Sequence, residues 1–172
     1  MKKVLVCMMI GLCLCLGACA KRQGYALDEK TFFLVMTNVQ FYPDRYVGED
    51  FEFDAFVYDL VDVDGNRHVT VARKCSAGYG CTCGKDTIIG FAVANDIELP
   101  PARNQSENNN DKTWLHIKGR IPSQDKQEIK IYAYSNGQTD YNTVETISFP
   151  TFVIEEFSVI EDYSHLSYYV TK

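Results

Sequence analysis

A strict alternation of side chains after Gly48 constrains the fold of this chain more than any other feature. Apolar residues occupy every second position of this stretch, as Phe51, Phe53, Ala55 and Val57. The positions between them begin as Glu52 and Asp54 and end as Phe56 and Tyr58. Because successive side chains of a strand point to opposite faces, this pattern predicts a strand with one wet face at its start and more burial toward its end.

Similar apolar segments follow, bounded by turn residues. They predict strands at 67–73, 87–93, 113–121, 128–134, 144–149 and 152–159. The sequence Asp64-Gly65-Asn66 predicts a tight turn rather than a calcium loop, since the distal glutamate of such a loop is missing. Pro150 separates the last two segments and predicts a break there, at a sheet edge or a bulge.

One helix is predicted before the strands, over residues 28–41. Asp28 is a good N-cap, and Pro43 ends the helix. Its buried face is predicted from a helical spacing of apolar residues: Phe32, Val35, Met36 and Val39.

These elements predict a mainly β protein, a small OB-like β-barrel of five to seven strands with one N-terminal helix. Gly119 within a strand, like the small Ala55, favours the bend that a barrel corner requires. A β-sandwich is the alternative. The length of 172 residues suits a single domain, expected over residues 27–172 with a mobile polar loop at 95–112.

The first residues predict an export signal rather than part of the fold. Two lysines precede an apolar run of about fifteen residues, shorter than the roughly 20 of a spanning helix, so residues 1–18 read as a signal peptide. Leucine, glycine and alanine stand directly before Cys19, which resembles the bacterial lipobox, whose cysteine is acylated. We expect lipidation at Cys19 and a tether over 19–26. An uncleaved anchor and an ordinary signal with a chance cysteine are the alternatives.

The charge of the chain indicates the surroundings in which it works. The formal net charge is −6, and loss of the two signal lysines makes it −8. Such an acidic protein repels phosphates, so no nucleic-acid partner is expected. We expect an extracytoplasmic protein, held by lipid to the cell membrane or to an outer membrane.

The candidate site is a cluster of three thiols between two predicted strands: Cys75, Cys81 and Cys83. One interpretation is a disulfide with one thiol left over, as export would favour. A second is a zinc or copper(I) site with Asp86 as fourth ligand, or less readily His68 or His116. A third is thiol redox chemistry, for which neighbouring cations would favour thiolates.

Signatures of other enzymes are missing from the sequence. It contains no glycine-rich phosphate loop, no serine elbow and no His-Glu-x-x-His. We therefore expect a protein that is not an enzyme, with a thiol oxidoreductase as the exception left open.

The order of several short motifs resembles a known family. The motifs lie at 46–58, 71–73, 83–86, 113–121 and 152–169. Together they are similar to the C-terminal soluble domain of a bacterial permease subunit family of unknown function, over roughly residues 31–170. The resemblance implies an accessory role beside a larger membrane permease, linked to zinc supply.

Three features depart from that family pattern. The adjacent cysteine pair is split by Thr82, Cys75 is additional, and Ala55 replaces a glycine. The membrane helices that precede the family's domain are replaced by the predicted lipid anchor. A role in holding a ligand outside the membrane carries over, whereas a transmembrane path does not. A disulfide-stapled interaction module of the cell envelope is the alternative function.

Overall fold

The fold is mainly β with one α-helix among the residues described, as predicted. The computed structural model describes residues 24–75, 87–103, 111–135 and 138–170. In chain order its elements are β1 (Gly24–Leu27), α2 (Phe32–Phe41), the 3-10 helix η1 (Pro43–Tyr46), β2 (Asp50–Val61), β3 (Arg67–Cys75), β4 (Thr87–Val93), β5 (Trp114–Arg120), β6 (Lys126–Ser135), β7 (Gln138–Val159) and β8 (Tyr169–Val170).

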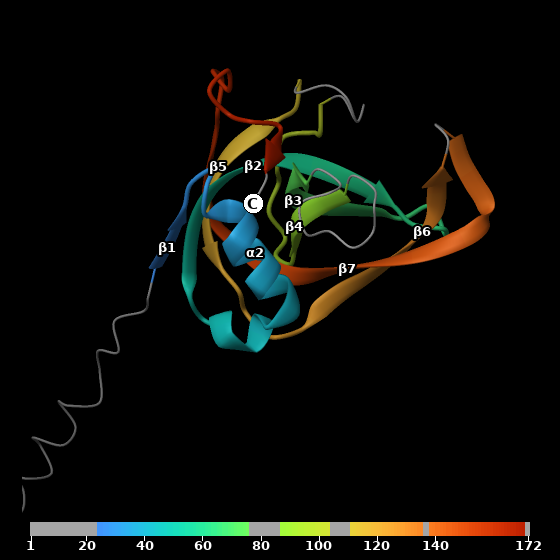
Figure 1. Cartoon of the computed structure of the whole chain (residues 1–172), viewed down its shortest axis with the longest axis horizontal. Helices are drawn as coiled ribbons and strands as arrows, with labels where there is room; N and C mark the ends of the chain where they lie inside the picture. The colour runs from blue at the N-terminus through green and yellow to red at the C-terminus, as the bar shows by residue number, and fades with distance from the viewer. Residues whose placement is uncertain (1–23, 76–86, 104–110, 136–137, 171–172) are drawn as a thin grey trace, which may run out of the picture.

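Five strands form a closed ring, seen in Figure 1. β2 pairs with β3 on one side and with β5 on the other, and the path returns through β7 and β4 to β3. Only the short β4–β7 pairing of this ring is parallel. Because the path closes by hydrogen bonds on both sides, the strands do not separate into the two sheets of the alternative sandwich.

Helix α2 supplies side chains to the core of the ring. Phe32, Met36 and Val39 are buried as predicted, and Val35 is partly buried against the same cluster. They pack with four rings from three strands: Phe51, Phe53, Phe91 and Phe152. The alternation in β2 therefore directs its apolar residues inward, as the period of two predicted.

The helix begins at Phe32, four residues after the predicted start. Residues 28–31 form a turn instead, in which Asp28 Oδ1 accepts hydrogen bonds from the backbone N–H groups of Lys30 and Thr31 at 3.0 and 2.8 Å. Asp28 thus satisfies free amides ahead of the helix, as an N-cap does, but one turn early.

The predicted break at Pro150 does not occur, because β7 runs through it without interruption. Residues before it pair with β6, and Thr151 and Phe152 pair with β4. From Val153 onward the strand pairs with β5. The proline lies where the strand changes partners, so its missing N–H removes little from either ladder.

β6 and the first half of β7 form a two-stranded arm that extends from the ring, on the right of Figure 1. Its base packs on the outside of the ring through Ile129 and Phe149, against Leu60 and Ala92. Gly119 lies at a β-bulge between β5 and β7, which agrees with the bend expected there.

Two short strands lie outside the sequence prediction. Residues 24–26, expected in the tether, belong to β1, which pairs in parallel with the start of β2. β8 pairs with the end of β3. Both have too few residues to show a period.

The predicted loop at 95–112 is partly packed on the core. Ile97, Leu99 and Ala102 contact the main apolar cluster. Asn95 exchanges two hydrogen bonds with the backbone of Ile154 at 2.9 and 3.0 Å. Residues 104–110 of this loop lie outside those described.

Candidate functional site

Cys75, at the end of β3, is the described member of the predicted thiol site. Its side chain is 3% exposed and belongs to the apolar core beside Val170. Burial raises the pKa of its thiol to about 12, although Arg73 and Lys74 oppose that shift. A metal ligand must be a thiolate that the ion can reach, so Cys75 fits a core side chain better than a ligand.

The remaining thiol-site residues, Cys81, Cys83 and Asp86, lie outside the described residues, as does Cys19. The structure does show the two residues that flank this segment, at the end of β3 and at the start of β4. Cys75 and Thr87 are paired across the β3–β4 ladder. Paired Cα atoms lie about 5 Å apart, so both ends of the loop are held at one point of the ring.

His68 is far from that point. It lies near the start of β3, and the seven residues to Cys75 span about 23 Å of extended strand. Its Nε2 lies 2.9 Å from Asp62 Oδ2, and its Nδ1 lies 2.9 Å from Gln127 Nε2. The two histidine nitrogens are thus engaged, and His68 does not join Cys75 in one site.

His116, in β5, lies on the outer face of the ring. Its Nδ1 is 2.7 Å from Asp54 Oδ1 and its Nε2 is 3.0 Å from Glu52 Oε1. Carboxylates accept and do not donate, so both contacts are hydrogen bonds at the same time only when both ring nitrogens carry a proton. These bonds raise the pKa of His116, mainly through Asp54, while the bond from His116 lowers the pKa of Glu52.

Neither histidine therefore meets Cys75. Throughout the described ranges, no group of three or more histidine, cysteine or acidic side chains is arranged to hold a metal ion. The metal prediction thus depends on residues of the 76–86 segment, which lies outside those ranges.

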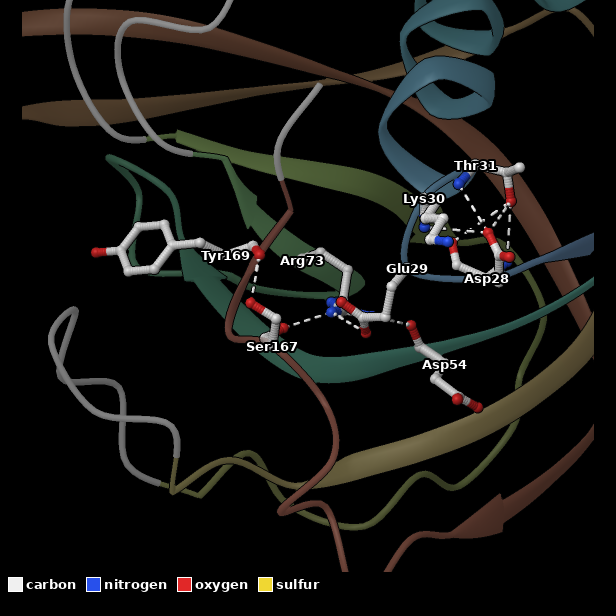
Figure 2. A network of polar contacts seen from close by, with 8 residues as sticks. All are labelled: Asp28, Glu29, Lys30, Thr31, Asp54, Arg73, Ser167 and Tyr169. Carbon is white, nitrogen blue, oxygen red and sulfur yellow. Dashed lines mark hydrogen bonds and ion pairs between the residues drawn. The ribbon is translucent and has the colours of Figure 1, made fainter.

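The sequence did not predict the polar network that surrounds Arg73 (Figure 2). This side chain is 2% exposed, and its Nη2 lies 2.5 Å from Glu29 Oε1 and donates to the backbone oxygen of Ser167. Nη1 donates to the backbone oxygen of Asp54 at 3.3 Å. Its guanidinium carbon lies 4.8 Å from the centre of the Trp114 ring.

This network joins three parts of the chain that are distant in sequence: the turn before α2, strand β2 and the C-terminal tail. The signal for it was a charged residue that follows the mostly apolar stretch 69–72 within a predicted strand. Arg73 is one of the neighbouring cations that the sequence places beside the thiol loop. In the structure Nη1 and Nη2 are hydrogen-bonded within the fold, while the buried Nε has no hydrogen-bond partner. The engagement of both terminal nitrogens reduces the value of Arg73 as a thiolate partner.

A cavity of about 350 Å³ lies beside His68. Its walls come from β3, the end of β4, residues 95–100 and Gln127. The side chains of His68, Gln127 and Asn95 are already hydrogen-bonded within the protein. The cavity therefore offers a recess with an exposed acidic rim, from Asp96 and Glu98, rather than a set of convergent free groups.

Within the described part of the chain, no helix has both the length and the apolar character needed to cross a bilayer. Comparison of the chain with models of protein families, with curated proteins and with solved structures finds no match in any of the three.

Proposed function

We propose that this chain is a lipid-anchored, non-enzymatic binding domain that works outside the cytoplasmic membrane as an accessory to a permease. The observation that carries the proposal is the lipobox-like sequence that ends at Cys19, followed after four residues by the first strand at Gly24. A folded domain this close to an acylated residue stays at the membrane surface and does not span the bilayer.

The anchor is tested by palmitate labelling of the protein and by the mass of the mature product, which shows where it begins. Expression of the full chain in a bacterium with labelled palmitate is expected to give a labelled product that begins at Cys19. The variant Cys19→Ser is expected to be unlabelled and uncut. A labelled Cys19→Ser product, or a wild-type product that keeps residues 1–18, would contradict the anchor.

Zinc is the ligand that the proposal assigns, held by Cys81, Cys83 and Asp86. Thiolates are soft ligands that suit zinc, and the resemblance to the permease subunit family supports the same metal. The burial of Cys75 supports its exclusion from the set. The second candidate is a disulfide among the same thiols, with the domain acting as an interaction module.

A zinc titration separates these two functions. The mature chain, purified without oxygen, is expected to bind zinc tightly, and Cys81→Ser and Cys83→Ser are each expected to weaken that binding. Cys75→Ala is the matched control and is expected to bind zinc as wild type does. No zinc uptake at micromolar concentration would overturn the assignment of zinc as the ligand. Two protected thiols in protein taken directly from the envelope would favour the disulfide.

The permease partner rests on the family resemblance. Cross-linking of the lipidated chain in intact cells is expected to capture a polytopic membrane protein. Capture of soluble envelope proteins alone would favour the interaction module instead.

A further inference from the structure

The proposed anchor restricts which end of the domain lies near the bilayer. From Cys19 to Gly24 the chain spans at most about 17 Å, even when fully extended. Gly24 pairs with Asp50, the first residue of β2. The end of the ring where β2 begins is therefore held close to the lipid surface, and this step rests on the proposed function.

The same end carries an exposed apolar patch, formed by Phe41, Tyr42 and Val47. Their exposed fractions are 69%, 48% and 43%. Among the described residues, the other exposed large apolar side chains are Leu34, Val61, Tyr141, Val144 and Val159. Phe41, Tyr42 and Val47 differ from them in lying next to the start of β2, where the tether joins the ring.

Contacts of Tyr46, which precedes Val47 in the chain, place this patch near β1. Tyr46, at the end of η1, packs against Tyr25 of β1 with 5.5 Å between ring centres. Val47 forms a bridge to Ile121, and Gly48 N–H donates to the Ile121 carbonyl at 2.9 Å. Figure 1 shows η1 at the lower end of the ring, where α2 finishes and β2 begins.

The chemistry of the patch suits the boundary between water and acyl chains. The guanidinium carbon of Arg45 lies 4.5 Å from the centre of the Tyr42 ring, so a cation and a phenol lie together beside apolar groups. Aromatic rings with a polar tip and long cationic side chains favour the headgroup level of a bilayer. Asp44 offsets the charge of Arg45, so the patch does not depend on anionic lipids.

A second exposed apolar pair lies on the arm and makes a matched comparison. Tyr141 and Val144 are 73% and 52% exposed, yet they belong to the far part of β7. In Figure 1 the arm extends away from β1, toward the opposite side of the ring. The short tether favours contact of the first patch with lipid and does not favour contact of the second.

We propose that Phe41, Tyr42 and Val47 form a membrane-docking surface that lies in the lipid headgroup region when Cys19 is acylated. The lipid anchor raises the local concentration of this surface at the bilayer, so a small patch suffices. The domain is then held in one orientation, with the η1 end toward the membrane.

The test uses the full lipidated chain in phosphatidylcholine vesicles, with and without bromine on the acyl chains. Phe41→Trp and Tyr141→Trp each add a fluorescent reporter, and wild type gives the background of the buried Trp114. We expect bromolipids to quench the added emission of Phe41→Trp and to leave that of Tyr141→Trp unchanged. Replacing Tyr42 by Ser in the Phe41→Trp chain is expected to reduce the quenching.

Vesicle flotation separates failure of this surface from failure of the anchor. If the chain floats with vesicles but Phe41→Trp is not quenched, the docking surface is overturned and the anchor stands. Equal quenching of both reporters would also overturn it, because the orientation would be lost. If the chain fails to float, the anchor is wrong and the docking surface falls with it.

Discussion

Arg73 and Glu29 form an ion pair of 2.5 Å that links the end of β3 to the turn before α2. The two residues differ in their surroundings, since the arginine is 2% exposed and the glutamate 37%. The pair thus joins the buried charge of the arginine to a carboxylate that is partly in water.

Removal of this arginine is expected to cost more stability than removal of an exposed one. Arg73→Ala leaves the Ser167 and Asp54 carbonyls without their donor and removes the group that packs on Trp114, so we expect a loss of about 2–4 kcal/mol. Arg120→Ala is the control, because its pair with Glu155 is exposed on both sides, at 39% and 44%, and contributes about 0–1 kcal/mol. Urea unfolding measures both, and equal losses would contradict a central role for Arg73.

Gly119 is expected to tolerate no side chain. A Cβ there would lie 2.1 Å from the Val153 carbonyl oxygen and 2.7 Å from a ring carbon of Phe152. Gly119→Ala must shift backbone, so we expect a loss of about 1–3 kcal/mol. Gly24→Ala, where nothing lies within 4 Å, is expected to change stability by less than about 0.5 kcal/mol. Thermal unfolding of both variants makes the comparison, and an unchanged Gly119→Ala would show that the sheet yields there.

The sequence predicted the elements with a clear period better than it predicted their ends. The alternation in β2 and the helical spacing of Phe32, Met36 and Val39 both report burial, which depends on one face of one element. The strand break predicted at Pro150 was wrong, because a proline interrupts a strand only where its missing N–H is needed for pairing. β7 changes its pairing partner at this position, and that change depends on the whole sheet and not on the local sequence.

The candidate site was less predictable, because it depends on which side chains the ring brings together. His68 and His116 were the less favoured candidates, after Asp86, to complete a site with the three thiols, and only if the fold brought them near. β3 instead holds His68 at its far end, and β5 holds His116 on the outer face. Arg73 was missed as a structural residue because Glu29 and Ser167, its partners, are separated from it by 44 and 94 positions.

Cys75 is expected to be unreactive while the protein is folded. Its pKa of about 12 leaves almost no thiolate near neutral pH, and its side chain is out of reach of solvent. In the mature chain with Cys81→Ser and Cys83→Ser, the one unacylated thiol is Cys75. A thiol reagent is expected to label it only after urea is added. Rapid labelling of the folded variant would place Cys75 back among the candidate ligands.

His116 is expected to make stability fall at alkaline pH. Its folded pKa lies above its ordinary value of 6.5, because Asp54 and Glu52 favour the protonated ring. The stabilisation it gives is therefore complete below pH 6.5 and is lost as pH rises through the raised pKa. Glu52, whose pKa is lowered from 4.5, acts in the opposite direction, so its contribution is lost as pH falls below that value.

Urea unfolding between pH 5 and 9 measures this dependence. Wild type is expected to lose more stability above pH 6.5 than His116→Gln, whose side chain does not titrate. His165→Gln is the control, since His165 lies exposed in the tail, and it is expected to follow wild type. If His116→Gln keeps the same alkaline loss, another group titrates, and the bonds to Asp54 and Glu52 contribute nothing measurable in water.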